Sequence, residues 1–243
     1  MLKLIQTEFM KLRRRRFVWL MLSAALFMPL FALFYFQHIG ETGIDSIQFY
    51  KWAAFSYTPW IILPVVLGML CTMLLYDEHQ YDVCKQLWIV PVHPMGYFFS
   101  KFAVVLFYAI LFMCITACAS VLAGSFSGCI VWGGNSALYL LKKCMEIGVL
   151  TAFAMIPVLA VAASQKGYIL PVCVTLIYTF LGFILLMVNM YLHPLSSTTA
   201  IVMGDVPGVV LSQELNRMAA LFCIGIWGVV STTAANIALH RRT

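Results

Sequence analysis

Six long apolar runs constrain this chain more than any other feature of its sequence. A helix needs about 20 mostly apolar residues to cross the hydrocarbon core of a bilayer. Only 10% of the 243 residues are charged, whereas soluble domains have about a quarter. The sequence therefore predicts an all-α integral membrane protein, with one domain over residues 1–243. Its six spans are expected at about 17–36, 57–76, 97–123, 144–163, 168–190 and 218–239.

The segment before the first run has a different pattern. Over residues 2–14, the apolar side chains of Leu2, Ile5, Phe9 and Leu12 share one helical face, which predicts an amphipathic helix lying along the membrane surface. The first apolar run carries no small-residue cleavage pattern, so we interpret it as a retained span rather than a signal peptide. A basic cluster at a span edge indicates topology and contact with lipid headgroups, not nucleic acid. This cluster consists of Arg13, Arg14, Arg15 and Arg16.

The distribution of basic residues predicts that both termini are cytoplasmic, because cytoplasmic loops carry an excess of lysine and arginine. With six spans in that orientation, eleven basic residues fall on the cytoplasmic side and four on the outer side. The four are Lys51, Lys142, Lys143 and Arg217. The outer segments are a short polar loop at 37–56, a glycine-containing loop at 124–143, and 191–217, which is apolar enough to contain short helices dipping into the outer leaflet.

The stretch YDEHQYDVCKQLWIVPVHPMGYFFSK, residues 76–101, lies between the second and third apolar runs and is predicted to be cytoplasmic. Its first half contains helix formers and no proline before Pro91, so a short helix is expected at about 78–91. Leu87, Trp88 and Ile89 form an apolar block on this helix. Such a block is buried either against a partner protein or at the bilayer interface.

The same stretch resembles a segment of type-2 ABC transporter permeases, in which an acidic residue, a short helix, a proline turn and a lysine follow each other at this spacing. Asp82–Val83 replaces the usual Gly-Thr, and His93–Pro94 replaces the usual Ser/Thr-Arg. The length and the basic N-terminus are most similar to the small permeases of lantibiotic-immunity and bacitracin-resistance exporters. The matching positions are Glu78, Tyr81–Asp82–Val83, Gln86–Leu87, Pro91–Val92, His93–Pro94 and Lys101.

The resemblance implies that residues 2–14 form an elbow helix and that residues 78–91 form a coupling helix, which docks in a groove on a separate ATP-binding subunit. Leu87, Trp88 and Ile89 would anchor that contact, and charge pairs would set its register. The other residues implied in ATPase coupling are Glu78, Asp82, Lys85, Pro91 and His93.

The resemblance also implies the assembly and its role. Two ATP-binding subunits would hold ATP and Mg, and a second permease chain, identical or homologous, would complete a complex in the bacterial cytoplasmic membrane. This chain itself would bind no cofactor and catalyse no reaction. The expected role is expulsion of a membrane-active peptide antibiotic for self-protection or resistance. The alternatives are a general lipid or drug exporter and, from another class, a membrane sensor or scaffold.

Motifs for other chemistry are missing from the sequence. It has no G-x-x-x-x-G-K-[ST] phosphate loop, no hydrolase motif and no metal-ligand spacing. Glu146 is the charged residue that we expect within a span. It either pairs with Lys142 or Lys143, which lie four and three residues away, or faces a path for a cationic substrate. Cys129 and Cys144 either form a disulfide or remain free.

Overall fold

The computed structural model describes residues 2–39, 46–80, 94–127, 134–165, 167–206 and 215–240. These residues form helices and turns, with no strand among them. The prediction of an all-helical protein with six helices that are able to cross a membrane is confirmed. The candidate spans are Arg16–His38, Ser46–Glu78, Pro94–Phe126, Asn135–Ser164, Ile169–Val188 and Arg217–His240.

Several spans are built from more than one helix. The first joins α2 (Arg16–Ser23), η1 (Ala24–Leu26) and α3 (Phe27–His38). The second joins α4 (Ser46–Tyr50), η2 (Lys51–Phe55), η3 (Thr58–Ile62) and α5 (Leu63–Gln80). The fourth joins α8 (Gly134–Ala154) and α9 (Ile156–Ser164), and the regular helix is interrupted at Met155, two residues before Pro157.

Two spans begin earlier than the sequence indicated. Residues 46–56 were expected in a polar outer loop, but from Ser46 to Phe55 the chain is helical, with Phe49, Tyr50 and Phe55 buried. The fourth span begins near Asn135 instead of residue 144. In both places aromatic and apolar side chains pack into the protein core, and this packing extends the helix beyond the most hydrophobic window.

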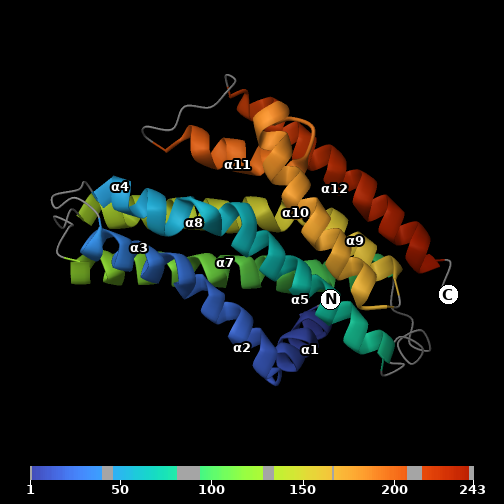
Figure 1. The fold of residues 1–243 in the computed structure, drawn as a ribbon. Coiled ribbons are helices and arrows are strands. Elements are labelled where there is room, and N and C mark those ends of the chain that lie inside the picture. The colour runs from blue at the N-terminus through green and yellow to red at the C-terminus, as the bar shows by residue number, and fades with distance from the viewer. Residues whose placement is uncertain are drawn as a thin grey trace.

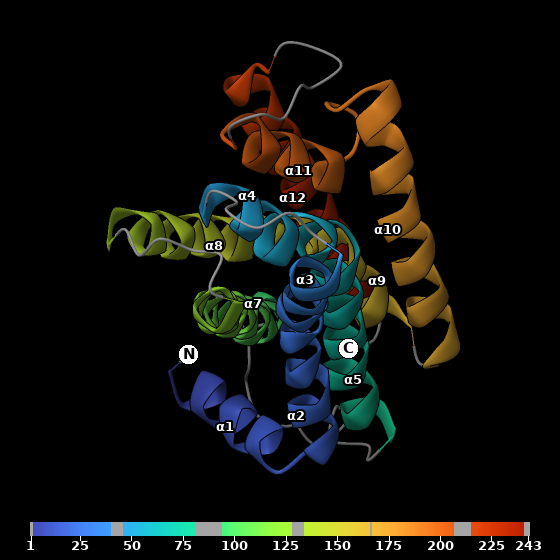
Figure 2. The same cartoon turned by 60° about the vertical axis from the view of Figure 1, so that its left-hand side comes forward.

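The long helix α7 (Pro94–Ser127) lies at the centre of the bundle and packs against α8, α3, α1 and α5. Figure 2 shows α7 nearly end-on, with α1 (Leu2–Arg13) crossing below it. Thus a helix does occupy the range predicted for the elbow helix. That this helix lies along a membrane surface stays a prediction. In Figure 1, α1 and the last turns of α5 and α12 lie toward the same end of the molecule.

The last third of the chain covers another side of the bundle. The helix α11 (Pro194–Gly204) packs against α8, α10 (Ile169–Val188) and α12 (Arg217–His240) (Figure 1). Its residues from Pro194 to Met203 are all buried, so a segment expected as outer short helices is part of the core. In contrast, α10 and α12 expose much of their apolar surface, as lipid-facing spans do.

Candidate functional site: a charged cluster at the base of the second and third spans

Three helices bring charged side chains together beside the predicted coupling segment. Glu8 and Lys11 come from α1, and Glu78 lies two residues before the end of α5. Lys101 and Tyr97 come from the first two turns of α7. Glu78 and Lys101 therefore stand on the two sides of residues 81–93, and α1 contacts both. We call these five side chains the elbow cluster.

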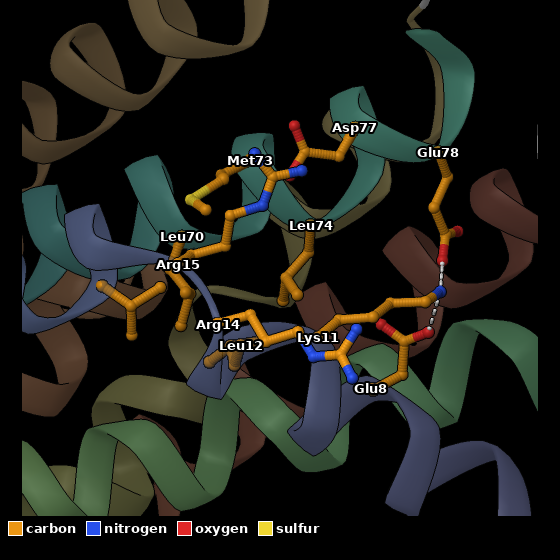
Figure 3. A pocket seen from close by; sticks show the side chains of 11 residues that line it. Glu8, Lys11, Leu12, Arg14, Arg15, Leu70, Met73, Leu74, Asp77 and Glu78 are labelled. Atoms are coloured by element: carbon orange, nitrogen blue, oxygen red, sulfur yellow. Dashed lines mark hydrogen bonds and ion pairs between the residues drawn. The ribbon is translucent and has the colours of Figure 1, made fainter. Parts of the chain in front are cut away.

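The two lysines of the elbow cluster each bridge the two glutamates. Lys101 Nζ lies 2.5 Å from Glu8 Oε2 and 2.6 Å from Glu78 Oε1. Lys11 Nζ lies 2.9 Å from Glu8 Oε1 and 2.6 Å from Glu78 Oε1. Figure 3 shows Lys11 between the two carboxylates. The hydroxyl of Tyr97 donates a hydrogen bond to Glu78 Oε2. Two positive and two negative charges thus balance within the cluster.

Most of the elbow cluster is shielded from solvent. The side chains of Lys101, Glu8 and Glu78 are 1%, 3% and 6% exposed, whereas Lys11 is 49% exposed. Burial lowers the pKa of Lys11, but its hydrogen bonds and charge interactions with Glu78 and Glu8 outweigh that effect and raise the pKa above the ordinary value. A buried charge without a partner is costly, so this geometry holds the three helices in one relative arrangement.

These buried charges correct one expectation. The sequence indicated Glu146 as the charged residue within a span, but Glu78, Lys101 and Lys143 also lie within the candidate spans. They are accommodated because oppositely charged side chains from neighbouring helices meet them inside the protein. One signal was available for Glu8, since it lies four residues from both Leu4 and Leu12 on one side of the helix and three residues from Lys11 on the other.

Among the residues predicted to contact the ATP-binding subunit, only some are described by the structure. Asp82, Lys85, Leu87, Trp88, Ile89, Pro91 and His93 lie outside the described residues, so the coupling helix stays a prediction. Glu78 is described, and its carboxylate binds partners within this chain. Glu78 is therefore bound inside the protein, and in the sequence it lies just before residues 81–93.

The four predicted headgroup arginines lie at the junction between α1 and α2, and all four are exposed. Arg15 pairs with Asp77 of α5 at 3.0 Å. Among the described residues, Arg13, Arg14 and Arg16 have no ion pair. Next to this junction, a pocket of about 290 Å³ opens between α1, α2 and α5 (Figure 3).

A second charged group joins α8, the end of α11 and the start of α12. Lys143 Nζ lies 2.7 Å from Glu146 Oε2 and 2.5 Å from Asp205 Oδ2, and Arg217 pairs with Asp205. We call these four residues the Asp205 cluster. The structure thus contains the pairing of Glu146 at a spacing of three, and Lys142 is exposed.

Two further predictions concern cysteines and metals. Cys129 lies outside the described residues, so a disulfide with Cys144 and two free thiols stay open as alternatives; Cys144 itself is buried. Within the described ranges, no group of three or more His, Cys, Asp or Glu side chains is arranged to hold a metal ion.

A family model described as ABC-2 family transporter protein matches residues 4–182. The chain belongs to the ABC-2 transporter family. No curated protein and no solved structure matches it. The matched range contains the whole elbow cluster and ends within α10. Membership makes this ABC-2 protein a multi-pass membrane subunit for transport that works with an ABC ATP-binding subunit and is not itself the ATPase. The family resemblance seen in the sequence is confirmed, and the lantibiotic or bacitracin subfamily stays a prediction.

Proposed function

We propose that this ABC-2 protein is the membrane subunit of an exporter that expels a membrane-active peptide antibiotic of the lantibiotic or bacitracin kind, or the lipid which that peptide targets. Two ATP-binding subunits would dock on the coupling helices of two such chains, which are identical or homologous. A general lipid or drug exporter is the alternative within the same class.

The elbow cluster is the observation that supports this proposal best. Glu78 and Lys101 flank the segment on which an ATP-binding subunit would dock. They bind each other, and Lys101 also binds Glu8. A displacement of that segment would therefore move the ends of α5 and α7 together. Because Glu8 and Lys11 belong to α1, the elbow helix would move with them. A conformational change driven by ATP would thus reach three elements of the membrane subunit at once.

The Asp205 cluster supports an amphipathic substrate. A cavity of about 450 Å³ lies between α8, α11 and α12 and is lined by Glu146, Arg217 and apolar side chains. Leu150, Ile201 and Leu221 are among the apolar residues. An amphiphile with a cationic group would place that group near the Glu146 carboxylate and its apolar part against these side chains. Because Glu146 pairs with Lys143 at 2.7 Å, a cationic peptide antibiotic would compete with Lys143 for this carboxylate.

Docking is tested by paired substitutions and recovery of the ATP-binding subunit. Leu87→Ala with Trp88→Ala is expected to abolish co-purification of that subunit, because the double change removes the apolar anchor. The matched control is Trp19→Ala with Leu20→Ala. These residues are also an adjacent Trp–Leu pair, and in α2 they are 62% and 65% exposed. Recovery of the ATPase at the wild-type level with the first pair would refute the coupling role of residues 78–91.

Transport is tested separately by ATP hydrolysis in lipid nanodiscs. The exporter proposal expects hydrolysis that depends on the membrane subunit and rises when a cationic peptide antibiotic is added. Glu146→Gln is expected to weaken the response to the peptide but to leave basal hydrolysis unchanged. If tagged chain from native membranes recovers no ATP-binding subunit, the sensor or scaffold alternative replaces the exporter.

A further inference from the structure

In the pocket at the junction of α1, α2 and α5, the positive charges lie closer to the surface than two of the three carboxylates. Its cations, Lys11, Arg14 and Arg15, are all exposed. The carboxylates of Glu8 and Glu78 are almost fully buried and are already bonded to lysines. The third carboxylate, Asp77, is 27% exposed and pairs with Arg15. A molecule that approaches the mouth therefore meets positive charge, although the charged residues lining the pocket are balanced overall.

The wall of the pocket is apolar and comes from the two spans that begin and end nearby. Val18 of α2 and Leu70 and Leu74 of α5 are buried, and Met73 is half-buried. The volume of about 290 Å³ is close to the lower limit of about 300 Å³ for small-molecule sites. The pocket thus has room for a headgroup and the first part of one acyl chain.

The surroundings of the mouth indicate where the pocket lies relative to the bilayer. Directly after the arginines, Phe17, Trp19 and Leu20 are 45%, 62% and 65% exposed. A tryptophan beside exposed apolar side chains and next to a basic cluster is typical of the membrane–water interface. The pocket therefore opens at the level of the lipid headgroups, where phospholipids have access to it.

We infer that this pocket binds one anionic phospholipid from the leaflet beside α1, with its phosphate on Arg14 and an acyl chain along Val18 and Met73. Arg14 has no ion pair among the described residues, so its guanidinium is available for a phosphate, which it is able to bind through two parallel hydrogen bonds. Arg15 is shared with Asp77 at 3.0 Å. Because Asp77 precedes Glu78, a bound lipid would contact the same turn of α5 as the elbow cluster.

The test uses the purified full chain in detergent and needs no ATPase, so its result is independent of the exporter proposal. Binding of phosphatidylglycerol and phosphatidylcholine is measured by native mass spectrometry. Phosphatidylglycerol is expected to bind about tenfold more tightly, and Arg14→Gln to remove that preference. Arg13→Gln is the matched control, since Arg13 is the neighbouring exposed arginine and does not line the pocket. It is expected to change binding less than twofold.

Three outcomes would overturn the inference. Equal losses in the two variants would mean a diffuse electrostatic attraction without a site. Displacement of the lipid by glycerol 3-phosphate would mean a site for free anions. Wild-type lipid binding by Arg14→Gln would mean that the phosphate does not lie on Arg14. If Arg14→Gln does not fold, Met73→Trp fills the same pocket, with Met69→Trp as its control outside the pocket.

Discussion

Replacing Lys101 with methionine is the most direct test of the elbow cluster. Methionine has about the length of the lysine side chain but no charge, so the change removes one cation and little volume. Glu8 and Glu78 would then be two buried carboxylates that share only Lys11, which is half-exposed. The cluster would change from neutral to one net negative charge.

The size of the effect follows from burial. Breaking a buried ion pair by removing one partner typically costs about 3–5 kcal/mol, and the side chains of Lys101 and Glu8 are 1% and 3% exposed. For chains of this length, about 1 kcal/mol lowers the Tm by about 2–4 °C, so the expected loss is about 6–20 °C. Glu8→Gln should cost less, because Lys101 keeps Glu78 as a partner.

The double variant separates charge balance from packing. Combining Glu8→Gln with Lys101→Met leaves Lys11 and Glu78 as a neutral pair at 2.6 Å. The double variant should therefore be more stable than the sum of the two single effects predicts. We expect a coupling free energy of about 2 kcal/mol, within the range of about 0.5–3 kcal/mol for contacting residues.

The buried cysteines provide the assay. Cys71 and Cys144 are fully buried, so a thiol-reactive dye reports their exposure as the protein unfolds in detergent. Exposed Cys118 and Cys173 are replaced by serine to lower the background. Lys142→Met is the control, because Lys142 is an exposed lysine on α8, and its Tm should change by no more than about 2 °C. A coupling below about 0.5 kcal/mol, or wild-type stability of Lys101→Met, would refute the conclusion that the elbow cluster holds α1, α5 and α7 together.

Three further changes test other contacts, each by its effect on the Tm. Gly68→Ala is expected to cost about 1–3 kcal/mol, because its Cβ would lie 2.0 Å from Thr175 Cγ2, and Thr175→Ala should recover part of that loss. Burial lowers the pKa of His193, which lies outside the candidate spans, from 6.5 to about 4. The contribution of neutral His193 to stability is therefore full above pH 6.5 and is lost as the pH falls toward 4. The variant His193→Asn should lack this pH dependence. Lys143→Gln should cost about 1–3 kcal/mol, since Asp205 would lose one of its two cationic partners; an unchanged Tm would contradict this.

The sequence predicted the architecture well because a bilayer leaves few choices. Runs of about 20 apolar residues must form helices, since backbone groups in lipid have to bond within the segment. The family pattern around residues 76–101 was also readable, because its acidic residue, prolines and lysine recur at fixed spacing. The span ends were less predictable: residues 46–56 are polar enough to suggest a loop, yet Phe49 and Phe55 are buried in the core.

The partners of individual charged residues could not be predicted from the sequence in the same way. By itself, the sequence determined six apolar helices, the basic junction at residues 13–16 and the resemblance to an ABC permease, since these depend on local composition and spacing. Only the tertiary structure decided that Glu8 and Lys101, which are 93 positions apart, meet at 2.5 Å. The physical reason is that the cost of burying a charge depends on which helix faces pack together, and the packing of α1, α5 and α7 supplies each charge with its opposite.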